Sequence, residues 1–158
     1  MVRAAAASRF AKRRDTKRGG TRIMTKVGFT GTQRGMTEAQ KKSLDDLLGE
    51  FPYQSEFHHG DCIGADAEAH DIADSLNYSI WIHPPRNSSR RAFKVAPHFG
   101  PPEEYLIRNK NIVNATDFLI ACPGEAQMLV RSGTWSTVRY AIRVGKRVRL
   151  VLPDGRIK

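Results

Sequence analysis

Short apolar runs alternate with amphipathic segments from residue 26 to the end of the chain, and this alternation restricts the fold more than any other feature. The predicted strands are 26–31, 55–60, 79–85, 118–122 and 146–153. The predicted helices are 36–51, 64–78, 103–117 and 131–144. Strands that alternate with helices of this length form parallel sheets with right-handed crossovers. The sequence therefore predicts an α/β fold, a three-layer sandwich with a mostly parallel five-stranded sheet in the order 3-2-1-4-5.

Local signals add detail to individual segments. Thr37 and Gln40 predict a capping box at the start of helix 36–51. Residues 86–102 are polar and longer than an ordinary connection in a compact α/β unit, so we expect them to form a lid. Helix 103–117 is expected to reach the core through Tyr105, Leu106, Ile112 and Val113.

Length and composition limit the class of protein. A chain of 158 residues corresponds to one domain. No apolar run approaches the ~18–20 residues of a membrane span, so no membrane partner is expected. Two cysteines, Cys62 and Cys122, are too few for a disulfide framework. They indicate a reducing compartment, and we expect a cytoplasmic protein.

The net charge of +10 is concentrated at the N-terminus. Residues 1–23 hold eight basic side chains against Asp15, whereas the other 135 residues hold 18 basic and 15 acidic ones. We therefore predict a disordered basic tail over 1–23 and one folded domain over 24–158. Three interpretations of the tail stay open: an arm that binds nucleic acid, an organellar targeting peptide, or an upstream extension of a chain that starts at Met24.

In open α/β sheets, ligands bind outside the carboxyl ends of the strands, where the strand order reverses. The predicted order places that crevice between the first and fourth strands. The loops that follow them, 30–35 and 123–134, are both rich in glycine, threonine and arginine, and the second begins at Pro123. We expect both loops, Pro123 included, to contribute to a ligand site.

The segment "RSGTWST" at 131–137 has the composition of an anion site at a helix start. The first turn of a helix leaves backbone N–H groups without partners and carries about half a positive charge, so a phosphate is stabilised there. The alternative is that one hydroxyl caps the helix and the others are incidental. The candidate ligand-binding residues here are Arg131, Ser132, Gly133, Thr134, Ser136 and Thr137.

Three further stretches carry candidate site residues. "TGTQRG" follows the first strand as a phosphate loop would, although it matches neither a P-loop nor a dinucleotide fingerprint. In "HHGDCIGAD", an aspartate is expected to accept hydrogen bonds from a ribose or a base, or else to stabilise the helix start. In "RNKN", an arginine is expected to bind a phosphate, or else to be solvated on an exposed helix face. The candidates are Thr30, Gly31, Thr32, Arg34, Gly60, Asp61, Gly64, Asp66, Arg108 and Asn109.

His58, His59, Cys62 and Cys122 are possible zinc ligands, but their spacing matches no established zinc pattern. We therefore predict neither a metal nor a separate cofactor.

Taken together, "GFTGTQRGMTEAQ", "HHGDCIGADAEAHDIA", "RNKNIVNATDFLIACP" and "RSGTWSTVRYAIRVGKRV" resemble the SLOG superfamily in the family's order. The resemblance runs from about Val27 to Pro153. This Rossmann-like group includes phosphoribohydrolases of the LONELY GUY type and DNA-processing protein A, and the middle pair is similar to small bacterial and phage branches. It implies a nucleotide or nucleotide-derived ligand and a homodimer. It also implies a ligand-binding role for Arg108 and a phosphate-binding loop reduced here to 132–134.

One departure from the family bears on catalysis. The phosphoribohydrolases carry a catalytic glutamate where this chain has Thr137, which cannot stabilise a cationic sugar transition state electrostatically. Three functions therefore stay open. The first is nucleotide binding without catalysis. The second is cleavage of nucleoside 5′-monophosphates with another carboxylate, Asp61, Asp66 or Glu125. The third is single-stranded DNA binding with the tail as an arm and Trp81 or Trp135 stacking on bases.

Overall fold

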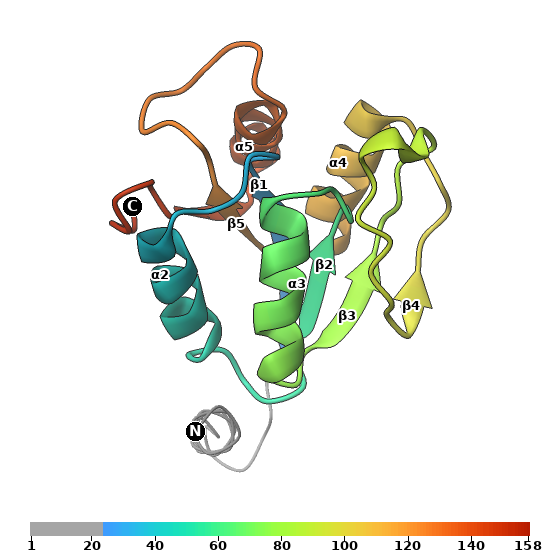
Figure 1. The fold of residues 1–158 in the computed structure, drawn as a ribbon, viewed down its shortest axis with the longest axis horizontal. Helices are drawn as coiled ribbons and strands as arrows, with labels where there is room; N and C mark the ends of the chain where they lie inside the picture. The colour runs from blue at the N-terminus through green and yellow to red at the C-terminus, as the bar shows by residue number, and fades with distance from the viewer. Residues whose placement is uncertain (1–23) are drawn as a thin grey trace.

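A computed structural model describes residues 24–158 of the chain (Figure 1). Its strands are β1 Lys26–Gly31, β2 Glu56–His59, β3 Ser79–Ile82, β4 His98–Phe99, β5 Phe118–Cys122 and β6 Arg147–Leu150. Its helices are α2 Glu38–Leu48, α3 Ala65–Ser75, α4 Tyr105–Ala115 and α5 Gly133–Arg143, with a short 3-10 helix, η1, at Ser88–Arg90. The predicted tail, 1–23, lies outside the described residues.

All strands run parallel in one sheet of order β4-β3-β2-β1-β5-β6. The predicted three-layer α/β fold and the relative order of its five strands are confirmed. The predicted strand count is wrong, because β4 adds a sixth strand at the edge. The sequence does not predict β4, because His98–Phe99 lies in the polar segment 86–102 without any alternation of apolar residues; contacts with β3 hold this strand in place. Gly100 N–H donates to Ile82 O at 2.8 Å, and the rings of Trp81 and His98 stack with centroids 4.3 Å apart.

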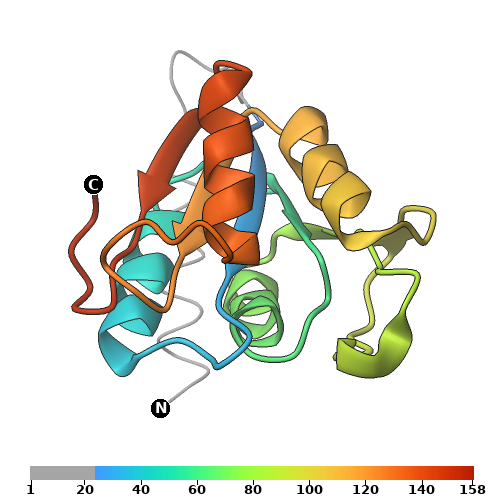
Figure 2. The ribbon, with the colours of Figure 1, turned by 90° about the horizontal axis from the view of Figure 1, so that it is seen from above.

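Helices cover both faces of the sheet (Figure 2). Helices α2 and α3 lie on one face, over a core whose largest members include Phe29, Phe57, Leu44 and Leu48. Helices α4 and α5 lie on the other face and bury smaller clusters around Val113, Leu119, Ala141, Ala121, Trp135 and Val138. Within residues 24–158, no helix combines the length and the apolar character needed to cross a membrane.

Helix α2 begins with the predicted capping box. Thr37 Oγ1 accepts from Gln40 N–H, and Gln40 Oε1 accepts from Thr37 N–H, both at 3.0 Å. The side chain of Gln40 is buried, and its Nε2 donates to Pro123 O at 2.8 Å and to Val151 O at 2.9 Å. The capping residue therefore also ties α2 to the chain that leaves β5 and β6.

Helix α4 differs from its predicted orientation. Ile112 and Val113 are buried as expected, but Leu106 is 63% exposed, whereas Arg108 is only 4% exposed. The inward face of the first turn of α4 meets the chain directly after β2 and β3, where Arg108 donates to Gly60 O and His83 O, instead of the apolar core. The prediction for Leu106 is wrong for this reason.

At Gly64 the loop that follows β2 packs closely against the loop that follows β1. Its φ of +89° lies in the left-handed region, and a Cβ there would overlap the backbone carbonyl of Gln33. Directly after it, Ala65 N–H donates to Thr32 O at 3.0 Å. Glycine is needed here because both the backbone angle and the close approach exclude a side chain.

We expect Gly64→Ala to lower the free energy of unfolding by about 1–3 kcal/mol, since a left-handed angle and a backbone overlap are both imposed on alanine. Urea denaturation measures this. Gly133→Ala is the matched control, because a Cβ at Gly133 meets nothing within 4 Å, and its midpoint should stay near that of the wild type. Equal midpoints for both variants would contradict the packing described here.

Candidate functional site

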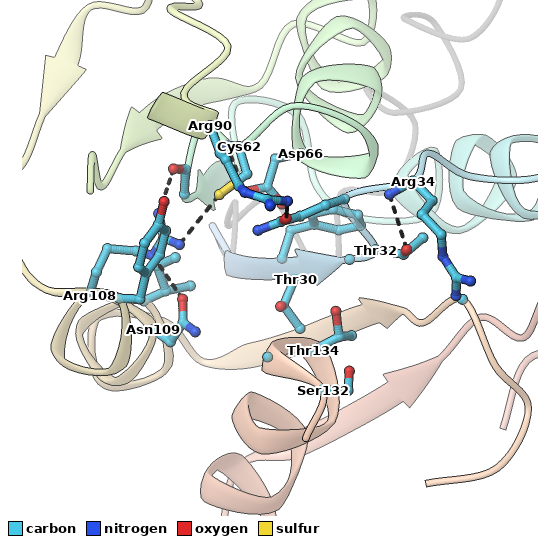
Figure 3. Close-up of a pocket in the computed structure, with 18 of the residues that line it drawn as sticks. Thr30, Thr32, Arg34, Cys62, Asp66, Arg90, Arg108, Asn109, Ser132 and Thr134 are labelled. Carbon is cyan, nitrogen blue, oxygen red and sulfur yellow. Dashed lines mark hydrogen bonds between the residues drawn. The ribbon is translucent and has the colours of Figure 1, made fainter. Parts of the chain in front are cut away.

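A cleft of about 670 Å³ opens at the carboxyl edge of the sheet, beside the ends of β1 and β5 (Figure 3). This is the point where the strand order reverses. Its walls come from the segments that follow β1, β2 and β5, from the first turns of α4 and α5, and from the segment around η1. The cleft is thus assembled from stretches that are far apart in the sequence.

Twelve of the seventeen predicted site residues line this cleft. They are Thr30, Gly31, Thr32, Arg34, Gly60, Asp66, Arg108, Asn109, Arg131, Ser132, Gly133 and Thr134. The other five lie outside the lining: Asp61, Gly64, Pro123, Ser136 and Thr137. Pro123 and Gly64 instead make the packing contacts described above.

The start of α5 contains both a cap and open donors. Ser132 Oγ accepts from Trp135 N–H at 3.2 Å, and Ser132 O accepts from Ser136 N–H at 2.8 Å. Gly133 and Thr134 lie in the first turn of α5 and line the cleft, and no described residue accepts a hydrogen bond from their N–H groups. Capping therefore consumes one hydroxyl and leaves two amides for a ligand.

The hydroxyls of Thr134 and Thr137 have different surroundings. Thr134 is 7% exposed and lines the cleft. Thr137 Oγ1 donates to Gly133 O at 2.9 Å within the helix. The Thr137 hydroxyl is thus directed into its own helix and not into the cleft.

Four arginines and two carboxylates line the cleft: Arg34, Arg90, Arg108 and Arg131 with Asp66 and Glu125. Arg34 forms an ion pair with Glu125, and Arg90 Nη1 donates to Gln33 Oε1 at 2.7 Å. The lining therefore carries more positive than negative charge, which favours an anionic ligand.

Arg108 is buried and connects several strand ends. Its Nη1 donates to Gly60 O at 2.5 Å and to His83 O at 3.2 Å, and its Nε donates to Asn109 Oδ1 at 2.7 Å. Gly60 leaves room for it, because a Cβ there would overlap the guanidinium. The alternative of a solvated arginine on an exposed face is wrong, since these carbonyls satisfy the cation inside the protein.

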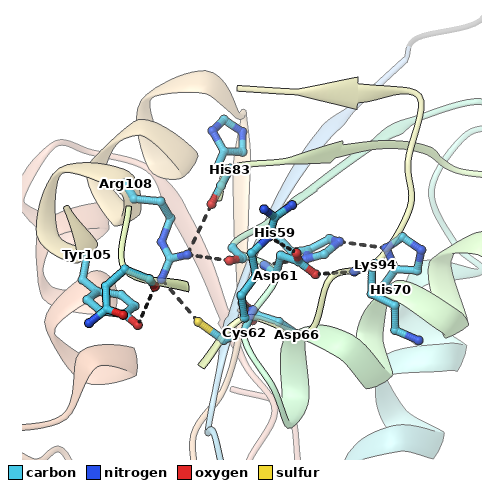
Figure 4. Close-up of polar contacts among 12 residues, drawn as sticks. His59, Asp61, Cys62, Asp66, His70, His83, Lys94, Tyr105 and Arg108 are labelled. Atoms are coloured by element: carbon cyan, nitrogen blue, oxygen red, sulfur yellow. Dashed lines mark hydrogen bonds and ion pairs between the residues drawn. The ribbon is translucent and has the colours of Figure 1, made fainter. Parts of the chain in front are cut away.

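Asp61 secures the segment 86–102 to the cleft rim (Figure 4). Its carboxylate is fully buried, pairs with Arg91 Nε at 2.7 Å and accepts from Lys94 N–H at 3.0 Å. Its carbonyl accepts from Ala92 N–H at 2.7 Å. Asp61 therefore has a structural role here, and the predicted lid is docked along the cleft, which it lines with Asn87, Ser89 and Arg90.

Asp66 lies in the first turn of α3 and faces the cleft. It is 6% exposed, and its Oδ2 accepts from Cys62 N–H at 3.2 Å. Burial raises the pKa of this carboxyl to about 6, although the nearby Arg108 guanidinium acts in the opposite direction. Asp66 thus lines the cleft where a ligand can reach it, whereas Asp61, five residues earlier, does not.

The histidines bond to one another instead of converging on a shared centre. His58 Nδ1 lies 2.8 Å from His83 Nε2, and His59 Nε2 lies 2.9 Å from His70 Nδ1. Among residues 24–158 no group of three or more His, Cys, Asp or Glu side chains is placed to hold a metal ion. Burial lowers the pKa of all four of these histidines, that of His83 to about 4.

The sequence does not predict several of the lining residues, among them Gln33, Asn87, Ser89, Arg90 and Tyr105. The polar stretch "RNSSRR" indicated a lid, but nothing in it singled out Arg90. Tyr105 is expected in the core, but it lines the cleft, and the centroid of its ring lies 5.3 Å from Arg108 Cζ.

Comparison with known proteins identifies structural neighbours. No protein-family model and no curated protein sequence matches the chain. The molybdenum cofactor binding protein from the phototrophic bacterium Rippkaea orientalis is 20% identical with a TM-score of 0.63, over 84% of this chain and 78% of that one. The molybdenum cofactor carrier protein from Chlamydomonas reinhardtii is 16% identical with a TM-score of 0.56, over 81% and 76%. A structural-genomics protein, TM1055, is 13% identical with a TM-score of 0.58, over 79% and 72%. These likenesses show a shared Rossmann-like fold.

We expect Asp61→Ala to lower the free energy of unfolding by about 3 kcal/mol, because it leaves Arg91 without its buried partner. Urea denaturation measures the loss, and limited proteolysis should cut faster within 86–102. Asp71→Ala is the control: within residues 24–158 the exposed Asp71 forms an ion pair with Lys94 Nζ alone, and its replacement should lower the free energy of unfolding by less than about 1 kcal/mol. A loss for Asp61→Ala no larger than that for Asp71→Ala would refute the anchoring role.

Stability should fall as the pH drops below about 6.5. The folded-state pKa values of His58, His59, His70 and His83 are lowered, so the unfolded chain binds more protons below 6.5, and the stability present above that pH is lost. Asp66, with its raised pKa, acts in the opposite direction but is a single group. Urea midpoints at pH 7.5, 6.5 and 5.0 should decrease in that order; a constant or rising midpoint would contradict the burial of neutral histidines.

Proposed function

We propose that this protein binds a nucleotide or nucleotide-derived ligand, a phosphorylated heterocycle, in the cleft between β1 and β5. The observation that carries the proposal is that Gly133 and Thr134 line the cleft and that their N–H groups have no acceptor among the described residues. A phosphate at this point would accept both N–H groups and lie at the positive end of α5.

The surroundings of the amides suit a phosphate. Arg131 and Thr134 line the cleft beside these amides, and Thr30 and Thr32 line it from the end of β1. Hydrogen bonds to a charged group each contribute about 1.5–3 kcal/mol, so two amides and one hydroxyl are enough to orient a phosphate.

The rest of the cleft leaves space for a ring. A volume of about 670 Å³ lies within the range of about 300–1,000 Å³ that is typical of small-molecule sites. Tyr105, Asn109 and Asp66 line it away from α5 and offer an aromatic ring and polar groups. A phosphate alone would occupy only a small part of this volume.

The structural neighbours support the same chemical class. Two of them are described as binding or carrying the molybdenum cofactor. That cofactor is a phosphorylated pterin, and the residues of this cleft fit it: the Gly133 and Thr134 amides would hold its phosphate, and the polar wall around Asn109 would face its ring. Phosphorylated pterins therefore stand beside nucleotides as candidate ligands.

Hydrolysis of nucleoside monophosphates is less well supported. Thr137 is directed into its helix, Asp61 pairs with Arg91 and Glu125 pairs with Arg34, which leaves Asp66 as the candidate carboxylate. Base stacking on tryptophan has no support, because Trp135 is 3% exposed and the Trp81 ring stacks on His58 and His98. A SLOG-type branch, a homodimer, a cytoplasmic location and nucleic-acid binding by the tail stay predictions.

The test uses thermal-shift assays and isothermal titration calorimetry of the full chain with AMP, GMP, the matching nucleosides and a pterin phosphate. A binder at 100 times its Kd should add about 2.7 kcal/mol of stability. We expect phosphorylated ligands to stabilise the protein and nucleosides to do so far less. Thr134→Val should weaken binding about 5- to 10-fold by removing one hydroxyl. Thr137→Val, its matched control, should leave the affinity unchanged.

Stabilisation by none of these compounds would refute the proposed function. Equal loss of affinity in the two threonine variants would refute the placement of the phosphate. Release of free base during the same incubations, detected by chromatography, would instead establish the hydrolase.

A further inference from the structure

Asp66 is an acidic group in a cleft that otherwise attracts anions. Arg34, Arg90, Arg108 and Arg131 all line the cleft with it. Glu125, the other lining carboxylate, is paired with Arg34. A site that served the phosphate alone would gain nothing from an acid at this position, because the acid repels the ligand.

The carboxylate of Asp66 is buried without an ion pair. Its Oδ2 accepts from Cys62 N–H at 3.2 Å, and the Gly60 backbone also faces it. Among the described residues no lysine or arginine nitrogen lies within 4.0 Å of it, since Arg108 is directed to Gly60 O, His83 O and Asn109 (Figure 4). A carboxylate can accept about four hydrogen bonds, so Asp66 can still accept hydrogen bonds from a ligand in the cleft.

Ring edges differ in the donors that they present to a carboxylate. Guanine and pterins share a 2-amino-4-oxo-pyrimidine edge, on which a ring N–H and an amino N–H lie side by side and match the two oxygens bidentately. Hypoxanthine keeps only the ring N–H. Adenine places a ring nitrogen lone pair beside its amino group, and this lone pair repels the second oxygen.

We propose that Asp66 selects ligands with a 2-amino-4-oxo-pyrimidine edge, guanine nucleotides or pterin phosphates, by accepting the ring N–H and the amino N–H. The selection rests on the proposed function, because the phosphate seat at Gly133 and Thr134 brings the ring into the cleft. Asp66 and the start of α5 belong to different walls of that cleft, so one ligand can engage both (Figure 3).

The experiment is isothermal titration of the full chain at pH 7.5 with GMP, IMP and AMP. GMP and IMP differ only in the 2-amino group, so their affinity ratio reports that single contact. We expect GMP to bind about 10-fold more tightly than IMP and about 100-fold more tightly than AMP, in line with the discrimination of a bidentate pair. A pterin phosphate titrated in parallel shows which of the two ring systems is preferred.

Asp66→Asn tests the residue, because its amide offers only one acceptor oxygen and places a donor against the ligand's own donor. We expect the preference for GMP over IMP to fall below about 2-fold. Asp71→Asn is the control on the exposed side of the same helix and should keep the wild-type ratio. A purely structural role of Asp66 would change all affinities together and leave the ratio intact.

The outcomes separate the two proposals. Wild-type binding of GMP, IMP and AMP within 2-fold of one another would overturn the role of Asp66 and leave the proposed function standing. A preference for GMP that survives in Asp66→Asn would also overturn the role of Asp66, as would tighter binding of AMP than of GMP. Absence of binding by all three nucleotides and by the pterin phosphate would overturn both proposals. If Asp66→Asn does not fold, the wild-type ratios alone decide.

Discussion

The pairing of β1 with β5 is the contact on which the rest of the molecule depends. These parallel neighbours are in register from Val27 with Phe118 to Gly31 with Cys122, and Thr32 N–H continues the ladder to Cys122 O at 3.1 Å. Beyond that point the chain turns from β1 to one face of the sheet and from β5 to the other. The two exits separate because their helices cover opposite faces, and the cleft is the space between them.

Buried polar side chains hold the walls of this cleft in place. Gln40 ties α2 to the carbonyls of Pro123 and Val151, Arg108 gathers the ends of β2 and β3, and Asp61 fixes the segment 86–102. Each of these groups is satisfied by backbone or by an opposite charge, as buried polar groups must be. The first residues of α5, Gly133 and Thr134, and the carboxylate of Asp66 keep hydrogen-bonding capacity free, and these residues line the cleft, where a ligand can reach them.

The charge distribution in the cleft matches a ligand with two chemically different ends. The start of α5 and the arginines favour an anion, whereas Asp66 requires a donor of hydrogen bonds. A phosphorylated heterocycle meets both conditions in one molecule. The Rossmann-like fold, shared with molybdenum cofactor binding and carrier proteins, provides the crevice, but the specificity comes from side chains that the fold does not dictate.

The sequence by itself determined five of the six strands, the helices, the capping box at Thr37 and the place of the cleft, because periodicity and turn chemistry are local and the crossover rules are general. It did not determine which polar side chains face a ligand. The sequence alone makes Asp61 and Asp66 equally good candidates for ligand binding, and likewise Thr134 and Thr137. Strand β4 has no local sequence pattern that predicts it. The tertiary structure decided between the candidates, because the partners come from distant segments: Arg91 lies 30 residues from Asp61, and Gly60 lies 48 residues from Arg108.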